Sequence, residues 1–442
     1  MARFVKPDIC LPWGVADYLP GQASALATIE AKVLQVACLW GFQRIIPASL
    51  EFDELLTTTM SEGEKSRAFR FDDWQSGRLL AIPSDITPQI ARIVATRLKG
   101  WPLPHRLCYA GRVLRHTELQ SGRSREILQA GVELIGLDSP EADAEMVSMA
   151  IEVIQGLGIK DWKVDLGQVE FSRGVLAASG LPDDVVAALK AAVGYKDVSL
   201  VSDILKKHPV PASTAREIMA LPRLFGGRDV LDTAEQLVEN SRSRAALENL
   251  RNVLQLLEMN GIEENLTIDL GESRGLDYHT GLTFQCFVPG SGDALFSGGR
   301  YDLLTSDYGM QAHATGFACN LVNLLKTVER QTKRPSDPQP REFLIFNSLE
   351  ERGEALALAR SLRKLGYVAV RDIIRRDLDS SIDYAARTGI SYIIVLGCDR
   401  CGSDRYQLVR ISDRSFFMVD KSGFLQGDFL AGIEKMQEKT DG

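Results

Sequence analysis

The sequence has no apolar run long enough to cross a membrane, which takes about 20 residues. It also lacks the marks of an exported protein. The first residues, MARFVKPDICLPWG, contain no apolar core segment and include an acidic residue and prolines, unlike a signal peptide. The seven cysteines are odd in number and scattered among mostly aliphatic neighbours, which is typical of reduced thiols. We therefore expect a soluble protein of the cytoplasm.

Excess positive charge is missing as well. Lysine and arginine total 51 against 59 aspartates and glutamates, and the formal net charge of −8 gives no broad electropositive surface for nucleic acid. Cys398 and Cys401 form a close pair, but no second pair or nearby histidine completes a zinc site. We expect a plain turn there rather than a metal or redox site, and we expect no bound metal or cofactor.

Two nucleotide-binding signatures are absent: the Walker A pattern and the glycine pattern of dinucleotide sites. A P-loop or Rossmann nucleotide site is therefore not expected. With 45% hydrophobic and 25% charged residues, the 442-residue chain has the composition of an ordinary globular protein. Its length suits two or three domains.

The order of predicted helices and strands favours an α+β fold. Apolar spacing predicts a helix over 25–41, and Ser139 and Pro140 are typical of the start of another that ends near Gly156. Strands are predicted at 265–271 and 280–288, and a further helix at about 316–330. Between 43 and 136 the chain reads as short apolar strands separated by turns: FQRIIPASL, RAFRFDD, RLLAIPS, HRLCYAGRVLRH and REILQAGVELIG.

Composition divides the chain into parts. Residues 1–330 form the predicted core, and about 172–262 reads as a helix-rich inserted module. The polar, proline-containing stretch 331–340 is typical of a linker. From 341 to 442 strands and helices alternate, which predicts a separate small α/β domain with a mainly parallel sheet.

One predicted strand carries polar residues in an unusual place. Successive side chains of a strand face opposite ways, so the apolar face of 125–136 belongs to the core. The other face presents Gln129 and Glu133 on either side of Gly131. Buried polar groups need partners, and such a floor suits a small ligand with an ammonium group, with Gly131 leaving room for it. The alternative is an ordinary solvated sheet face.

Two other segments are candidate walls of that pocket. Asp85 and Thr87 lie between a strand and the next helix, where either side chain could instead cap that helix. The stretch 274–281 brings together Arg274, Tyr278 and His279. A lone histidine is usually structural, and no sequence neighbour supports a general-base role for this one.

Taken together, these segments resemble the histidyl-tRNA synthetase family of class II synthetases. The resemblance covers almost the whole chain, and the RGLDYHTG stretch is particular to the histidine-handling branch. It implies an antiparallel sheet flanked by helices, a dimer formed through the core, and an anticodon-binding-like C-terminal α/β domain. The landmarks are DIT (85–87), GRVLRH, GRSREILQAGVE, RGLDYHTG, SGGRYD and GFACNLVNLL.

The family has two functional branches, true synthetases and regulatory subunits of ATP phosphoribosyltransferase, the first enzyme of histidine biosynthesis. Three departures favour the regulatory branch. Arg115 matches the motif 2 arginine that grips ATP, but Thr117 stands where the synthetases have glutamate. Asn323 replaces the motif 3 arginine for the outer phosphates, which leaves a triphosphate short of a cation. Where tRNA-binding relatives have a lysine-rich helix start, this chain has acidic residues that would repel phosphates: Asp377, Asp379 and Asp383.

The histidine pocket of the family is matched in part. Gln129 and Glu133 match the residues that hold the ammonium group, and 85–87 matches the synthetase Glu-Gly-Thr with a shorter acid. Tyr278 is kept, whereas His279 replaces a second tyrosine. Arg274 matches the arginine that assists adenylate formation, which favours a synthetase instead.

The leading hypothesis is therefore a chain without catalytic activity of its own. It would bind the short catalytic subunit of ATP phosphoribosyltransferase, activate it and contribute to histidine feedback control, with tRNA not expected as a partner. The alternatives are an active histidyl-tRNA synthetase and a synthetase-like scaffold protein. The candidate ligand site, for histidine, comprises eight residues: Asp85, Thr87, Arg115, Gln129, Glu133, Arg274, Tyr278 and His279.

Overall fold

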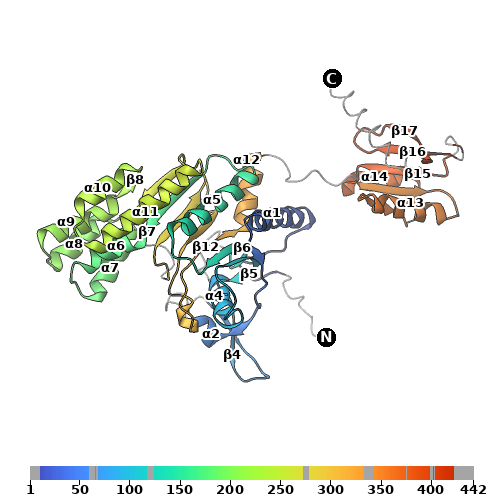
Figure 1. Ribbon diagram of the computed structural model, residues 1–442. Helices are drawn as coiled ribbons and strands as arrows, with labels where there is room; N and C mark the ends of the chain where they lie inside the picture. Colours follow the sequence, from blue (N-terminus) through green and yellow to red (C-terminus); the bar gives the residue numbers. More distant parts are fainter. Residues whose placement is uncertain are drawn as a thin grey trace, which may run out of the picture. The chain divides into compact units, whose positions relative to one another are not determined.

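The chain forms two compact units, Met1–Ser336 and Asp337–Gly442, and the division falls inside the predicted linker. Figure 1 shows the computed structural model. The structure describes residues 10–58, 65, 68–116, 124–271, 278–332, 342–374, 376–398, 402 and 404–422.

A large sheet organises the first unit. In spatial order its strands are β1 (Gln43–Arg44), β5 (His105–Leu114), β6 (Glu126–Ile135), β12 (Ala314–Asn320), β11 (Phe296–Arg300), β10 (Leu282–Phe287), β7 (Lys163–Gln168), β9 (Leu266–Asp269) and β8 (Phe225–Gly226). The pairings from β5 through to β7 are all antiparallel. Only β1 with β5 and β7 with β9 pair in parallel within the described part of this sheet.

Three helices cover one face of this sheet: α1 (Pro20–Leu39), α5 (Pro140–Gly156) and α12 (Leu321–Thr332). The side chain of Ser139 accepts a hydrogen bond from the Ala142 amide at 3.4 Å, which is the cap that the sequence predicts. Apolar side chains such as Ile29, Met146 and Val132 fill the space between helices and sheet. This is the larger core of the molecule.

The opposite face of the sheet bears the start of α4 (Thr87–Thr96) and a short 3₁₀ turn, Ser306–Tyr308. Its core includes Ile90, Tyr109 and Tyr301. Residues 51–82 add a small three-stranded sheet. Its strands, in spatial order, are β2 (Glu51–Phe52), β4 (Leu79–Ile82) and β3 (Phe69–Asp72), and α2 (Asp53–Thr57) packs against β4.

Helices dominate residues 169–259, where the sequence predicts a helical module. In chain order they are α6 (Val169–Ala177), α7 (Asp183–Gly194), α8 (Val198–Lys207), α9 (Ala212–Ala220), η1 (Leu221–Arg223), α10 (Asp229–Leu237) and α11 (Ser241–Met259). The last of them packs against both α5 and α6. Figure 1 shows these green and yellow helices gathered at one end of the first unit.

The second unit has a five-stranded sheet in the order β14 (Val368–Arg371), β13 (Glu342–Asn347), β15 (Tyr392–Leu396), β16 (Arg405–Arg410) and β17 (Phe416–Asp420). Helix α13 (Gly353–Lys364) packs on the face of Phe343, and α14 (Leu378–Thr388) packs on the face of Leu344.

Two predictions about the elements need correction. The sheet of the second unit is mixed, because β16 and β17 add antiparallel pairs to the parallel pairs of β13. The helix predicted from about 316 starts at Leu321 instead, and 316–320 belongs to β12. That strand pairs on both edges and is largely buried, so its apolar run cannot be told from a helix by periodicity. The Asn320 side chain accepts the Val322 amide at 3.0 Å and so marks the true helix start.

None of the helices within the described ranges is long and apolar enough to cross a membrane.

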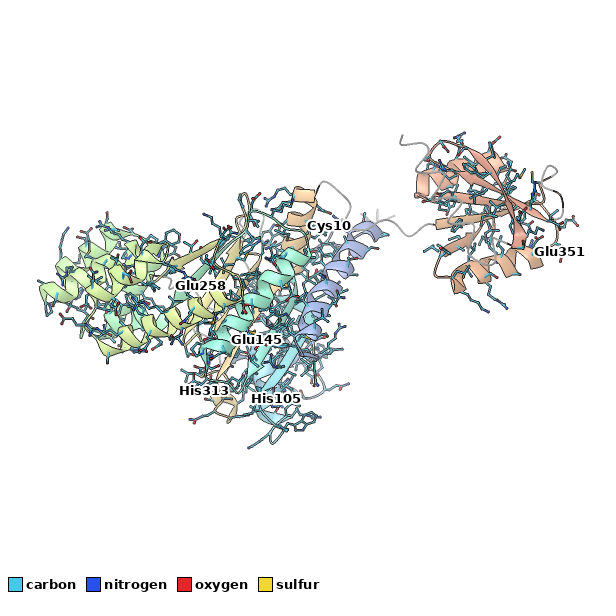
Figure 2. The ribbon with its side chains drawn as sticks, turned by 45° about the horizontal axis from the view of Figure 1, so that its top comes forward. Cys10, His105, Glu145, Glu258, His313 and Glu351 are labelled. Atoms are coloured by element: carbon cyan, nitrogen blue, oxygen red, sulfur yellow. The ribbon has the colours of Figure 1, made fainter. Side chains whose placement is uncertain are left out.

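A buried histidine at the start of β5 predicts loss of stability in acid. His105 is 7% exposed, burial lowers its pKa, and Nε2 has no hydrogen-bond partner among the described residues. Figure 2 shows it near the same end of the unit as His313. The unfolded chain takes up this proton below its ordinary pKa of 6.5, and the folded chain does so only at lower pH. The free energy of unfolding should therefore fall as pH drops below 6.5.

His105→Asn should show a shallower fall in urea titrations at pH 7.5 and 5.5, whereas His208→Asn should behave like the parent. Equal pH dependence in His105→Asn and the parent would refute this.

Candidate functional site

The polar face of β6 is buried rather than solvated. Gln129 is 5% exposed and Glu133 is 1% exposed, and both lie under the start of α4. The solvated-face alternative is thereby excluded. What remains is a polar cluster enclosed by the apolar core that contains Ile86 and Tyr301.

Glu133 is the centre of this cluster. Its Oε1 accepts hydrogen bonds from the hydroxyls of Thr87 at 2.7 Å and Tyr109 at 3.0 Å, and its Oε2 accepts one from Tyr301. Burial raises the pKa of Glu133 to about 8, although the hydroxyl donors favour the carboxylate. Burial therefore favours the protonated form of this carboxyl more than it would for an exposed glutamate.

Glycines make room for this arrangement. A Cβ on Gly131 would lie 2.6 Å from the Tyr109 hydroxyl oxygen, and a Cβ on Gly316 would overlap the Glu133 carboxylate. The sequence predicts that Gly131 leaves space for a ligand. The structure corrects this, because Tyr109 lies opposite Gly131 in the β5–β6 pairing and its ring fills that space.

Asp85 is the more accessible acid of the site. Its Oδ1 accepts from Gln129 Nε2 at 2.9 Å, and its Oδ2 accepts from the Tyr278 hydroxyl at 3.1 Å. Gln129 Oε1 in turn accepts the Ile86 amide at 3.2 Å, which fixes the orientation of the side-chain amide. Helix α4 has no side-chain cap at its start, so the capping alternative for Asp85 and Thr87 is not realised.

Of the remaining predicted residues, the structure describes Arg115 and His279 but not Arg274. Arg115 Nε donates to the carbonyl of Ser84 at 2.6 Å, which places it beside the Asp85 segment. His279 is 7% exposed, and its ring centroid lies 5.1 Å from that of Tyr278. Arg274, together with Thr117 of the motif 2 loop, lies outside the described residues.

Tyr109 and Tyr301 were not predicted as site residues. Tyr109 lies in β5 and Tyr301 directly follows β11, and both hydroxyls donate hydrogen bonds to Glu133. Only the folded sheet brings these distant segments together. A local signal existed for Tyr109, because it is a tyrosine within the buried run 107–109 and faces Gly131 of the neighbouring strand. The SGGRYD landmark includes Tyr301, but nothing in that motif indicates that its hydroxyl donates to Glu133.

Comparison with known proteins assigns the fold to a family. The family model described as histidyl-tRNA synthetase matches residues 14–324. A curated relative from Geobacter sulfurreducens, named ATP phosphoribosyltransferase regulatory subunit, is 56% identical over 91% of this chain and 92% of its own length. One of the same name from Syntrophotalea carbinolica is 49% identical over 97% and 99%.

The chain belongs to the ATP phosphoribosyltransferase regulatory subunit family.

Solved structures agree with this membership. A Bacillus halodurans protein titled as an ATP phosphoribosyltransferase regulatory subunit/histidyl-tRNA synthetase is 28% identical, with a TM-score of 0.76 over 85% of this chain and 96% of that one. The histidyl-tRNA synthetase of Nostoc sp. PCC 7120 has a TM-score of 0.80 at 19% identity, over 96% and 99% of the two chains, and so shows the shared fold alone. The regulatory subunit family therefore has a class II synthetase body.

In this member the departure at Asn323 lies in the first turn of α12. Its amide approaches the Asn320 side-chain oxygen at 3.4 Å, so the helix start is capped locally. The acidic start of α14 also has local partners. Asp377 caps the helix by accepting the Ser380 amide at 2.7 Å, and Asp383 pairs with Arg414 at 2.8 Å. These two aspartates therefore have structural roles in addition to their charge.

The arrangement has the chemistry of a binding site. It offers a half-buried carboxylate, a side-chain amide and a carboxyl surrounded by hydroxyl groups, all of which suit a small cationic ligand. In the described part of the chain, no three histidine, cysteine or acidic side chains gather as metal ligands.

The buried carboxyl of Glu133 predicts a second pH effect, of opposite sign to that of His105. The folded chain keeps a proton up to about pH 8 that the unfolded chain releases near 4.5. Stability from this group is complete below pH 4.5 and is lost as pH rises through 8. Its slope is at most about 1.4 kcal/mol per pH unit. Glu133→Gln should flatten this part of the profile in urea titrations from pH 5 to 9.

Glu258→Gln is the control, because that side chain is 46% exposed on α11 and pairs with Arg228. It should retain the slope of the parent. A Glu133→Gln profile as steep as that of the parent would show that Glu133 is already ionised in the folded chain.

Proposed function

We propose that this chain is the non-catalytic regulatory subunit of ATP phosphoribosyltransferase. It binds a short catalytic subunit, raises its activity and contributes to histidine feedback control. The observation that carries this proposal is the pair of relatives above, 49–56% identical over nearly their full lengths and bearing that name. On this proposal the chain acts in the cytoplasm, needs no cofactor and does not take tRNA as a partner.

The ligand of the candidate site on this proposal is histidine. Asp85 bonds to Gln129, and Glu133 bonds to Thr87, two residues beyond Asp85 on the same segment, so both acids are held at one short stretch of chain, where they can attract a cation. The tyrosine hydroxyls of the cluster and the ring of His279 add polar and aromatic surface of the kind that an imidazole contacts. These surfaces favour, as the ligand, an amino acid whose side chain carries nitrogen over one whose side chain is purely aliphatic.

Departures from the synthetase pattern support the absence of catalysis. Asn323 is a neutral residue where the synthetases have an arginine for the outer phosphates, and Thr117 stands in place of an adenine-binding glutamate. Asn323 contacts the Asn320 side chain and is not among the partners of Glu133.

Self-association through the core is part of the same proposal. The edge strand β1 is followed by Ile46, 77% exposed, and Leu39 at the end of α1 is 74% exposed. Large apolar side chains beside an open sheet edge favour pairing with another chain.

The function is tested by adding the purified chain to the short catalytic subunit encoded by the same genome. The rate of ATP and phosphoribosyl pyrophosphate condensation should rise, and histidine should lower the rate of the mixture. Histidine-dependent exchange of pyrophosphate into ATP by the chain alone would overturn the proposal in favour of a synthetase. Failure to bind the catalytic subunit would overturn it in favour of a different partner.

Asp85 gives a direct test of the ligand site. Asp85→Asn keeps the shape but removes the charge, and hydrogen bonds to charged groups contribute about 1.5–3 kcal/mol. Histidine affinity in calorimetry should therefore fall roughly 10- to 100-fold. Asp203→Asn, at an exposed carboxylate on α8, should bind as the parent does. Equal affinity in Asp85→Asn would remove this residue from the site.

A further inference from the structure

A hairpin of β3 and β4 holds a tryptophan out in solvent. The two strands pair antiparallel from Phe69 with Ile82 to Asp72 with Leu79, and Trp74 is in the turn that joins them. Its side chain is 97% exposed, the highest value among the large apolar residues of the described chain. Figure 1 shows this hairpin projecting from the body of the first unit, with β4 labelled at its base.

The turn is held in one conformation. The Asp73 amide donates to the Arg78 carbonyl at 2.9 Å, and the Gly77 amide donates to the Asp73 carbonyl at 2.7 Å. The Asp73 carboxylate accepts the Gln75 amide at 3.1 Å and the Ser76 hydroxyl at 2.6 Å. Gly77 has a φ of +68°, which favours glycine. A tip ordered in advance loses little entropy when it binds.

The arginines of the hairpin, one on β3 and one at the turn end of β4, are already paired. Arg70 Nε lies 2.5 Å from Asp53 Oδ1, and Arg78 pairs with Glu54. Arg78 also lies over the Phe52 ring, 3.2 Å from its centroid. These pairs leave no excess positive charge for a nucleic acid or an anionic membrane, so the indole is the main recognition feature of the tip.

The hairpin is joined directly to the candidate ligand site. Strand β4 ends at Ile82, three residues before Asp85. The connecting residues are fixed to the large sheet, because the Leu114 amide donates to the Pro83 carbonyl at 3.0 Å and Arg115 donates to the Ser84 carbonyl. A displacement of the hairpin would therefore shift Asp85, whose carboxylate contacts Gln129 and Tyr278, through only three connecting residues.

We propose that the β3–β4 hairpin is a docking element for the catalytic subunit, with Trp74 inserted in an apolar pocket of that partner. This inference rests on the proposed function. Continuity with the ligand site selects this occupant, because feedback by histidine needs a physical link between the ligand and the partner. A second copy of this chain has a separate apolar surface at the β1 edge, where Leu39 and Ile46 are exposed.

The test compares three variants of the full chain. Trp74→Ala should bind the catalytic subunit at least about 30-fold more weakly in calorimetry, the loss typical of a central interface tryptophan. Asp73→Ala keeps the indole but loses the side-chain bonds of the turn, so its affinity should lie between those of Trp74→Ala and the parent. Tyr195→Ala removes another aromatic side chain, 80% exposed, beyond the end of α7, and should bind normally.

A spectroscopic measurement reports contact directly. Iodide should quench the fluorescence of free Trp74, and the catalytic subunit should protect it; Trp74→Phe should remove the protected component. Because Trp74 is almost fully exposed, thermal unfolding of Trp74→Ala should match that of the parent.

The outcomes separate this inference from the proposed function. If the parent chain does not bind the catalytic subunit, the proposed function fails. If the parent and Trp74→Ala bind it equally, the hairpin inference alone fails. If Trp74→Ala binds equally but changes the sedimentation of the chain by itself, the hairpin joins copies of this chain, which also overturns the inference.

Discussion

Placement of the Glu133 carboxyl in the core is the constraint on which the site depends. A buried acid without partners is strongly unfavourable, and here three hydroxyls from three separate segments meet it. Thr87 comes from the start of α4, Tyr109 from β5 and Tyr301 from just beyond β11. Satisfying one side chain therefore fixes the relative positions of a helix and two strands. The glycines at 131 and 316 are consequences of the same packing.

This arrangement gives the pocket two acids of different character. Glu133 is enclosed and burial raises its pKa, whereas Asp85 is half-buried and is held by the Gln129 amide and the Tyr278 hydroxyl. Asp85 lies in the segment between β4 and α4. That segment also carries the connection to the β3–β4 hairpin.

The sequence predicted the parts of the site that a local pattern can reveal. The alternation of side chains on one strand was enough to place Gln129 and Glu133 on a common face, and that face is buried. Tyr109 and Tyr301 were missed because their contact with Glu133 arises only from sheet pairing across distant segments. The sequence predicts a helix from about 316, where the structure has the end of β12 (314–320). A central strand that is buried on both faces shows no period-two alternation, so its apolar run resembles a helix. The two extra strands of the second unit are hairpin neighbours whose pairing changes the parallel sheet to a mixed one.

The Glu133 cluster and the start of α12 are held by separate sets of contacts. The proposed amino-acid contacts come from β6, the segment before α4 and Tyr278, and they support each other through hydrogen bonds. Asn323 instead lies on α12, where its contact is with the local helix cap. A substitution there leaves every donor to Glu133 in place. Contacts to the triphosphate can therefore be lost without destabilising the buried acid, whereas loss of the amino-acid pocket would leave that acid without its partners. This asymmetry favours retention of the buried cluster when contacts elsewhere in the fold change.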